Sequence, residues 1–119
     1  MGAGSLHEAV EAAFNAGDID GIVALYEPDA AFVGEAGDTA VGLDAIRSVW
    51  AELVALGGQL SMTTRYVHEV EDVALLSNSW SFTIGGEVAD SSTTAEVAHR
   101  QGDGSWRYVI DCPFGATDR

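Results

Sequence analysis

The start of the chain carries apolar residues at the spacing of an amphipathic helix. From Ser5 to about Ala16 they recur every three or four residues, which makes one side of a helix apolar. Ser5 and Glu8 have the spacing of a capping box, in which two side chains bond backbone N–H groups at the helix start. The pattern therefore predicts a first helix over residues 5–16. Its apolar stripe consists of Leu6, Ala9, Val10, Ala13 and Phe14.

Two more helices and a hairpin are predicted before the first long strand. Asp18 can cap a second helix, and Pro28 ends it. Short strands at 31–33 and 39–41 flank a turn-rich segment and indicate a hairpin. A third helix ends at Gly57, because glycine readily adopts the left-handed conformation that often follows a helix. The apolar sides of these helices are Ile19, Ile22, Val23 and Tyr26 in the second and Leu43, Ile46, Trp50, Leu53 and Val54 in the third.

From Gln59 onward the apolar period changes to the alternation of β-strands. Turn signals at Glu71-Asp72, Gly85-Gly86 and Asp103-Gly104 divide the remainder into four strands joined by hairpins. Helices segregated from an antiparallel meander predict an α+β fold, and the length predicts one domain over residues 1–119. The predicted strands span residues 59–70, 73–84, 93–101 and 105–112.

Both faces of the predicted meander carry large apolar residues. A sheet with one face in water would alternate more cleanly between apolar and polar positions. We therefore expect the helices to cover one face and a second copy of the chain to cover much of the other, which gives a homodimer. One face carries Met62, Tyr66, Val70, Val73 and Leu75, and the other carries Val67, Leu76, Trp80, Phe82 and Ile84.

The chain is strongly acidic, with 19 Asp and Glu residues, 5 basic residues and a formal net charge of -14. Nucleic-acid binding needs a basic stripe against phosphates, and peripheral membrane binding needs basic residues against anionic lipid. Neither pattern is present, so we expect no nucleic-acid and no membrane partner. The single cysteine, Cys112, cannot form an internal disulfide, and the N-terminus has no signal-peptide pattern, so a cytoplasmic location is expected.

Several strings along the chain resemble one superfamily. They are residues 25–32 (Leu-Tyr-Glu-Pro-Asp-Ala-Ala-Phe), 41–47 (Val-Gly-Leu-Asp-Ala-Ile-Arg), 72–75 (Asp-Val-Ala-Leu) with Trp80, and 103–111 (Asp-Gly-Ser-Trp-Arg-Tyr-Val-Ile-Asp) followed by Pro113-Phe114-Gly115. Together they span nearly the whole chain. They resemble the nuclear transport factor 2-like superfamily, also called SnoaL-like or ketosteroid-isomerase-like, and within it the small bacterial SgcJ/EcaC-type proteins.

The resemblance implies a cystatin-like cone, in which three N-terminal helices pack on a strongly curved mixed or antiparallel sheet around a central pocket. Members of the superfamily use this pocket as isomerases, cyclases, dehydratases or epoxide hydrolases, or as a binding or oligomerisation module. Fold alone does not choose among these activities, since function depends on the pocket residues. Cys112 stands where relatives usually have the asparagine of an Asp-Asn-Pro-Phe-Gly motif, so no role of that asparagine is carried over.

The last hairpin is expected to bring two acidic residues together. Adjacent carboxyl groups on paired strands have Cβ atoms about 4.5–5.5 Å apart, so they can share a proton, and the pKa of one rises if the site is dry. A carboxyl acid or base that works near neutral pH needs such a shift, which makes Asp111 the first catalytic candidate and Glu96 the second. The alternative is that both are hydrated, or that Asp111 caps the turn into Pro113. A turn at Asp103-Gly104 pairs Gln101 with Trp106, His99 with Tyr108, and Glu96 with Asp111.

His68 and Arg65 are further polar candidates in the strands. His68, predicted on the same face as Tyr66, has the chemistry to move a proton near pH 7, or it is a partly buried histidine with one hydrogen bond. Arg65 is expected across from Asn78 and near Trp80. There it either orients a carboxylate, enolate or epoxide oxygen or forms an ordinary ion pair.

The candidate pocket walls are aromatic, and their alternative role is to pack the core. No phosphate-binding loop, metal-binding spacing of His or Cys, or nucleophile elbow is present, so no cofactor and no metal are expected. Cys112 has no adjacent histidine and precedes Pro113, which predicts an inert thiol. The wall residues are Tyr26, Phe32, Trp50, Tyr66 and Trp80.

Two functions of different classes remain open at this point. The first is a cofactor-free isomerase, cyclase or dehydratase that acts on a small apolar carbonyl compound. In it Asp111 is the acid or base, and Tyr26, Asn78 or His68 supply hydrogen bonds. The second is a non-catalytic module that binds a small apolar molecule or assembles through the outer face of the sheet.

Overall fold

The computed structural model describes residues 2–116, and Met1 and residues 117–119, the ends of the predicted domain, lie outside the described residues. The predicted α+β class is confirmed, and the two longest strands have the predicted bounds. The helices are α1 (Ser5–Asn15), α2 (Ile19–Val23) and α3 (Leu43–Ala55). The strands are β1 (Tyr26–Val33), β2 (Thr39–Val41), β3 (Gln59–Val70), β4 (Val73–Ile84), β5 (Glu87–Thr93), β6 (Ala95–Arg100) and β7 (Trp106–Cys112).

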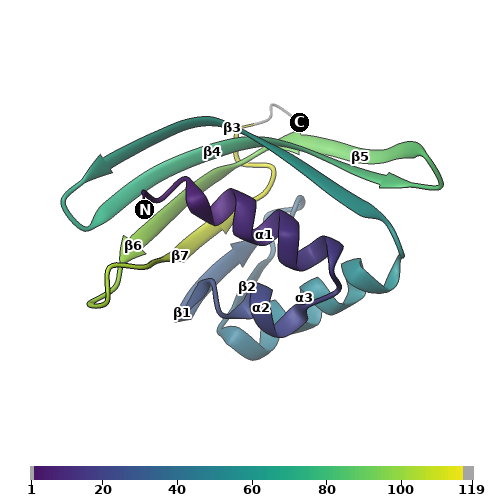
Figure 1. The fold of residues 1–119 in the computed structure, drawn as a ribbon. Helices are drawn as coiled ribbons and strands as arrows, with labels where there is room; N and C mark the ends of the chain where they lie inside the picture. The colour runs from purple at the N-terminus through teal and green to yellow at the C-terminus, as the bar shows by residue number, and fades with distance from the viewer. Residues whose placement is uncertain (1, 117–119) are drawn as a thin grey trace.

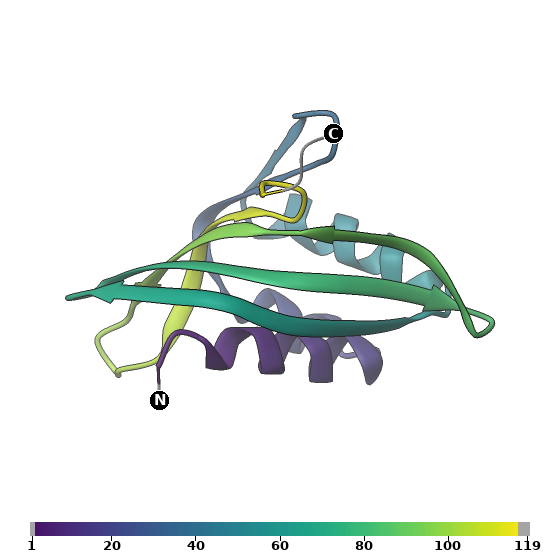
Figure 2. The same ribbon diagram turned by 90° about the horizontal axis from the view of Figure 1, so that it is seen from above.

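The strands form one curved sheet whose concave face holds the helices (Figures 1 and 2). The strand order is β2-β1-β7-β6-β4-β3, and β5 pairs with β4 outside this path. The sheet is mixed, because β1 runs parallel to β7 while the other pairs are antiparallel. Helix α1 packs along β3, and α3 packs against β1 and β2. This arrangement places β6 and β7 in the middle of the sheet, facing the space between the helices.

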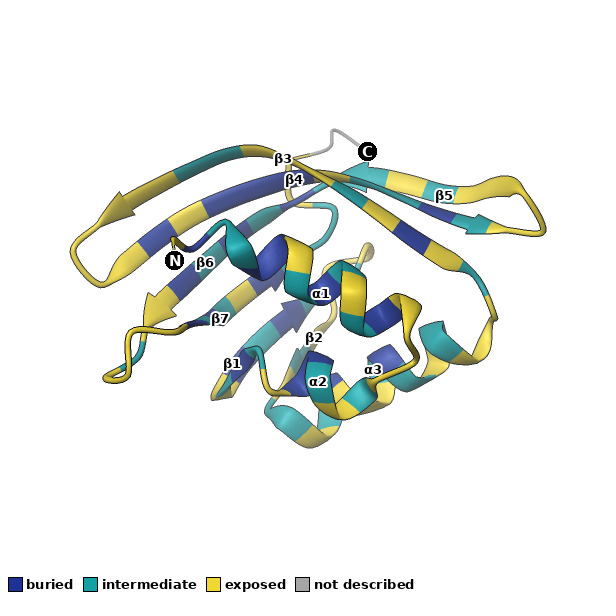
Figure 3. Ribbon diagram, viewed as in Figure 1, coloured by how far each residue is buried: buried dark blue, intermediate teal, exposed yellow. Residues whose placement is uncertain are grey.

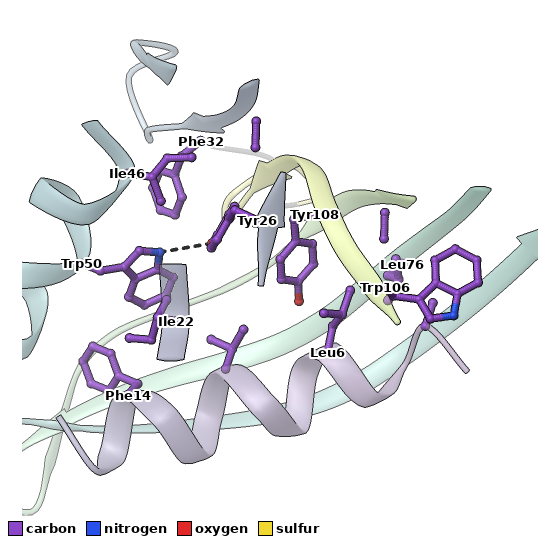
Figure 4. Close-up of a cluster of buried hydrophobic side chains, with 14 of the residues drawn as sticks. Leu6, Phe14, Ile22, Tyr26, Phe32, Ile46, Trp50, Leu76, Trp106 and Tyr108 are labelled. Carbon is purple, nitrogen blue, oxygen red and sulfur yellow. Dashed lines mark hydrogen bonds between the residues drawn. The ribbon is translucent and has the colours of Figure 1, made fainter. Parts of the chain in front are cut away.

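Apolar side chains of the helices and the inner face of the sheet form the core (Figures 3 and 4). On α1 the buried residues Val10 and Phe14 repeat at helical spacing. The ring of Phe14 makes edge contacts with Trp50 of α3 and Phe82 of β4, each with ring centroids 5.8 Å apart. Such aromatic pairs contribute about 0.5–1.5 kcal/mol beyond the burial of their surface. These contacts hold α1 and α3 against the sheet.

Side chains of α1 also cover the edge of β3, the last strand of the sheet. Asn15 accepts a hydrogen bond from the Leu60 N–H at 2.8 Å and donates one to the Leu60 carbonyl at 2.9 Å. Glu11 accepts from the Met62 N–H at 2.6 Å. An open strand edge is a template for pairing with another chain, and these side chains occupy its backbone groups instead. The same bonds fix the position of α1 over the sheet.

The predicted capping box at the start of α1 does not form. Gly4 occupies the cap position, and the Ser5 hydroxyl donates to the carbonyl of Gly2 at 2.9 Å. The turn formed by residues 2–7 already provides carbonyl acceptors for the first N–H groups of the helix. None of these N–H groups is therefore left for the Glu8 side chain to bond. The predicted cap of α2 is confirmed, because the carboxylate of Asp18 accepts from the N–H of residue 21 at 2.9 Å.

Helix α2 is shorter than predicted, and Tyr26 and Pro28 belong to β1. The backbone of Tyr26 is taken up by the sheet, where it pairs with Tyr108 of β7. Pro28 lies in a stretch of β1 where the register with β7 shifts, and proline is tolerated in strands at such irregular positions. The proline therefore interrupts strand pairing instead of ending a helix.

The predicted strand over residues 93–101 corresponds to β6, and β5, which precedes it, was not predicted. The Gly85-Gly86 turn leads directly into β5, whose largely polar sequence lacks the alternation that reveals a half-buried strand. Both strands pair with β4, β6 along residues 73–76 and β5 along residues 79–84. Thr94 lies at the break, where its Oγ1 accepts from the Asn78 N–H at 2.9 Å. The break lets one long chain segment follow the bend of the sheet.

A bulge in β3 changes which of its side chains face inward. The register of β3 with β4 shifts between Thr64 and Tyr66. Met62 therefore lies opposite Trp80 on the inner face, and its predicted place on the same face as Tyr66 is wrong. One extra residue in a strand reverses the facing of the side chains beyond it, and strand periodicity alone does not locate such a residue.

A second bulge lies in the hairpin of β6 and β7. Between the turn and this bulge the predicted pairs are one residue out of register. Beyond the bulge, the predicted pairing of Glu96 with Asp111 is confirmed. The observed pairs near the turn are Arg100 with Trp106, His99 with Arg107, and Ala98 with Tyr108.

Candidate functional site

A cavity of about 440 Å³ lies between the inner face of the sheet and the helices α1 and α3. Its walls are mainly apolar and aromatic, and several of these side chains are seen in Figure 4. The four acidic residues Glu52, Asp90, Glu96 and Asp111 also line it, and among residues 2–116 no arginine does. The cavity therefore suits an apolar molecule without negative charge. The main wall residues are Phe14, Phe32, Trp50, Leu53, Trp80 and Phe82.

Glu96 of β6 and Asp111 of β7 form a buried acid pair in the cavity. The register places the two residues directly opposite each other, and they are only 3% and 5% exposed. Two carboxyl groups this close in a dry site resist being ionised together. The pair therefore favours a state with one negative charge and one proton. The alternative in which both groups are hydrated is not the arrangement observed.

Asp111 receives a hydrogen bond whose direction is set by the residues behind it. The Trp50 Nε1–H, which can only donate, lies 3.1 Å from the Tyr26 hydroxyl oxygen (Figure 4). The Tyr26 hydroxyl accepts this bond and donates to Oδ2 of Asp111 at 2.5 Å. Because Oδ2 accepts this bond, a proton on Asp111 is placed on Oδ1.

Glu96 is held by nitrogen atoms on the other side of the pair. His7 Nε2 lies 2.6 Å from Oε1, and Asn78 Nδ2 donates to Oε2 at 3.4 Å. The second ring nitrogen of His7, Nδ1, lies 2.8 Å from Oγ1 of Thr64. Glu96 therefore has a nitrogen partner for each oxygen, while Asp111 has one hydroxyl donor and the cavity. The two neighbouring carboxyl groups occupy different environments.

Burial, and after it the adjacent Glu96, raise the pKa of Asp111 from 3.8 to about 8, although the hydrogen bond from Tyr26 lowers it in part. Asp111 is therefore protonated at neutral pH. Burial, aided by the nearby carboxylates, also raises the pKa values of Tyr26 and Tyr108 well above their usual range, so both phenols stay protonated donors. Burial and the same carboxylates raise the pKa of the Cys112 thiol, which agrees with the predicted inert thiol.

Tyr108 places a second donor beside the acid pair. It lines the cavity and is 1% exposed, yet its hydroxyl has no hydrogen-bond partner within residues 2–116. Glu96 is near enough to raise the pKa of this phenol, but the geometry does not form a hydrogen bond. Buried polar groups are nearly always bonded to protein or water, so an unsatisfied one facing a cavity indicates a position for a bound molecule.

The predicted wall and hydrogen-bonding residues divide into two layers. Phe32, Trp50 and Trp80 line the cavity. Trp80 donates its Nε1–H to the Pro113 carbonyl at 2.8 Å, which fixes the ring as part of the wall. Tyr26 and Asn78 do not line the cavity but contact Asp111 and Glu96, respectively, through the hydrogen bonds described above.

The remaining predicted site residues, Arg65, Tyr66 and His68, do not line the cavity, and their predicted position there is wrong. The bulge in β3 puts Tyr66 and His68 on the outer face of the sheet, where their rings stack 5.1 Å apart. Arg65 donates to Oγ of Ser77 at 2.8 Å and lies 5.7 Å from the Tyr66 ring, so it faces neither Asn78 nor a ligand in the cavity. His68 is therefore no longer a catalytic candidate.

Two residues of the site, His7 and Tyr108, were not predicted from the sequence. His7 shares the buried stripe of α1 with Val10 and Phe14, and a polar residue in such a stripe is the signal that could have identified it. Tyr108 was paired with His99, because the bulge in the last hairpin is not visible in the strand pattern.

Within the described residues, 2–116, no three or more His, Cys, Asp or Glu side chains are grouped so as to hold a metal ion. In the same part of the chain, no helix has the length and apolar character needed to cross a bilayer. The chemistry of the site therefore has to be considered from its carboxyl, phenol and imidazole groups.

Three solved structures illustrate the structural likeness. A domain of unknown function with a cystatin-like fold from Nostoc punctiforme is 20% identical, with a TM-score of 0.82 over 96% of this chain and 75% of that one. A proposed dehydratase of the nuclear transport factor 2-like family from Streptomyces avermitilis is 17% identical, with a TM-score of 0.79 over 97% and 94%. A ketosteroid isomerase-like protein from Erwinia carotovora atroseptica is 20% identical, with a TM-score of 0.70 over 97% and 94%.

These identities are low, so the likeness concerns the fold, which is the predicted cystatin-like fold. No curated protein matches the chain. The family model of the SnoaL-like domain, in contrast, matches residues 6–109, from the first turn of α1 into β7. The chain has the fold of structures described as nuclear transport factor 2-like and ketosteroid isomerase-like, and it belongs to the SnoaL-like domain family.

Proposed function

We propose that this protein is a cofactor-free acid–base catalyst that isomerises, cyclises or dehydrates a small apolar carbonyl compound. One observation carries the proposal: the buried Asp111 lines an apolar cavity, beside Glu96 and with one oxygen bonded by the Tyr26 hydroxyl. A carboxylic acid that remains protonated at neutral pH is a competent proton donor inside such a cavity. The SnoaL-like family includes isomerases and dehydratases, which supports the reaction class.

The site has groups for both halves of a proton transfer. Asp111 donates its Oδ1 proton toward the substrate oxygen, and the free Tyr108 hydroxyl donates a hydrogen bond to the same oxygen. The carboxylate formed on Asp111 then takes a proton from the substrate carbon next to the carbonyl group. After these two transfers Asp111 again holds one proton, as it did at the start. The apolar walls exclude water, which strengthens both interactions.

The cavity also supports a substrate class. Its volume of about 440 Å³ lies within the usual range of about 300–1,000 Å³ for small-molecule sites. Its acidic lining residues, with no arginine beside them in the described part of the chain, disfavour carboxylates, phosphates and other anions. A neutral, largely apolar carbonyl compound fits these limits best.

Hydrogen–deuterium exchange tests the proposal without knowledge of the product. A panel of monocyclic and bicyclic apolar enones is incubated with the protein in D₂O, and deuterium uptake at the carbon next to the carbonyl is followed by proton NMR. We expect wild type to accelerate uptake for at least one enone and Asp111→Asn to reduce the rate by about 100-fold or more. Asp103→Asn, a change at an exposed turn, is the matched control. Equal rates in wild type, Asp111→Asn and buffer for every enone would refute the proposal.

The outer face of the sheet supports the second candidate, assembly with another copy of the chain. His68, Leu75, Val97 and Ile110 form a row across β3, β4, β6 and β7, and Leu75 and Ile110 are 44% and 40% exposed. The acidic residues of these four strands all face inward, although the chain carries 19 of them. They are Glu69, Glu96 and Asp111.

The part of the outer face that β3, β4, β6 and β7 form carries no acidic side chain of its own, and there two chains of net charge -14 repel each other least. We therefore expect a dimer through this face. Light scattering at micromolar concentration should give the mass of two chains for wild type and of one chain for Leu75→Glu. Val41→Glu is the control, because Val41 is 64% exposed on β2, away from this face. A wild-type mass of one chain would exclude the dimer.

A further inference from the structure

His7 is a buried polar residue on an otherwise apolar stripe of α1. It is 2% exposed, and it follows the same helical spacing as Val10 and Phe14, which pack the core. Burying an imidazole costs free energy unless its nitrogens are bonded, and both are: Nδ1 to Thr64 and Nε2 to Glu96. His7 does not line the cavity, so it reaches a bound molecule only through Glu96.

The proton between His7 and Glu96 has a preferred position. The Thr64 hydroxyl can donate to Nδ1 of His7, and the ring hydrogen is then on Nε2, from which it is donated to Oε1 of Glu96 at 2.6 Å. Glu96 then accepts at Oε1 from His7 and at Oε2 from Asn78, and hydrogen bonds accepted by both oxygens favour the charged form of a carboxyl group. His7 thus stabilises the ionised form of Glu96.

The partner carboxyl group has no such support. Asp111 accepts one hydrogen bond, from the neutral Tyr26 hydroxyl, and it lines the cavity. The groups that face the acid pair come from α1 (His7), β1, β4, β7 and α3, and His7 is the only base among them within the described residues. The others are the neutral side chains Tyr26, Asn78, Tyr108 and Trp50.

We propose that His7 is a positioning residue that holds Glu96 as the ionised member of the acid pair and so leaves the transferable proton on Asp111. As a role in catalysis this rests on the proposed function of Asp111, but the location of the proton is measurable without turnover. In this arrangement the acidic proton is on the member of the pair that is not bonded to His7. If Glu96 carried the proton, the acidic group would be the carboxyl that is bonded to His7.

Two substitutions of His7 separate its contact with Glu96 from its packing. The amide nitrogen of glutamine reaches the position of Nε2, so His7→Gln keeps an N–H toward Glu96. The shorter amide of asparagine reaches only the position of Nδ1, so His7→Asn keeps the contact with Thr64 and loses the one with Glu96. Both variants remove the ring, and a purely structural role would affect them alike.

Carbon-detected NMR of Asp and Glu carboxyl groups at pH 6.5 reports which group is protonated. We expect the proton on Asp111 in wild type and largely in His7→Gln. In His7→Asn the ratio of protonated Asp111 to protonated Glu96 should fall by about ten- to a hundredfold, because Glu96 loses a hydrogen bond to its charged form. The enone exchange rate should fall in His7→Asn and be restored in part by His7→Gln.

The same ratio in His7→Asn and wild type would overturn the inference. A proton found on Glu96 in wild type would also overturn it, and this measurement remains possible if His7→Asn does not fold. The proposed function fails separately: if wild type exchanges no enone but His7→Asn moves the proton, the positioning role stands and the acid–base function does not.

Discussion

Asp111→Asn provides a direct test of the proton that the structure places on Asp111. The asparagine amide has nearly the shape of the neutral acid: its oxygen can accept from Tyr26, and its NH₂ group takes the place of the O–H at the cavity. The variant keeps the geometry of the protonated site but cannot ionise. Its stability should therefore lack the pH dependence that Asp111 gives to wild type.

The magnitude follows from the two pKa values of Asp111. The pKa is about 8 in the folded protein and 3.8 for an ordinary aspartate, so between these values the folded state holds one proton more than the unfolded state. Wild-type stability therefore falls as pH rises from 3.8 to about 8, and the loss is complete above that range. At about 1.4 kcal/mol per pH unit, wild type loses on the order of 4 kcal/mol relative to Asp111→Asn between pH 5 and pH 8.

Urea unfolding of both proteins at intervals from pH 5 to pH 8 measures this difference, and subtraction cancels the contribution of the other carboxylates. Asp103→Asn is the control, because hydrogen bonds from Ser105 lower the pKa of Asp103 and keep it ionised throughout this range. Its difference from wild type should stay constant. A constant difference for Asp111→Asn as well would show that Asp111 is already ionised at pH 5, and the proposed acid would be refuted.

Three further substitutions test other parts of the structure. Tyr26→Phe removes the hydrogen bond that lowers the pKa of Asp111, so NMR titration should place that pKa above its wild-type value; no change would contradict the directed bond. Asn15→Ala leaves a backbone pair of β3 uncovered and should cost about 1–3 kcal/mol in urea unfolding, whereas a neutral effect would show that water replaces the amide. Gly58→Ala should lower the melting temperature by several degrees, because a Cβ there would lie 2.6 Å from the Phe82 ring and 2.7 Å from a backbone carbonyl.

Local patterns were sufficient to predict most elements of the fold. The helical stripe of α1, the glycine after α3 and the alternation in β3 and β4 each involve residues close in sequence. The two Gly residues before β5 marked a turn, but β5 itself is polar and was missed. Tyr26 was assigned to a helix because its spacing fitted one, and only its pairing with Tyr108, far along the chain, places it in a strand.

The candidate site was predictable only where the predicted hairpin register agrees with the observed one. Glu96 and Asp111 lie beyond the bulge of their hairpin, and the bulge restored the register that had been assumed. In β3 the bulge had the opposite effect and moved Tyr66 and His68 to the outer face. A bulge depends on how two strands and their cover pack together, so hydrophobic periodicity does not reveal it.

By itself, the sequence determined the α+β class, the family, the acidic surface and the pairing of two carboxyl groups, because these follow from composition, short strings and local hydrogen bonding. Tertiary structure alone decided which face of each strand encloses the cavity and which residues support the acid pair. His7 reaches Glu96 across 89 positions of sequence, and the pKa of Asp111 rises because surrounding side chains remove water. Both effects arise from distant segments meeting in the folded chain, and no local pattern encodes that meeting.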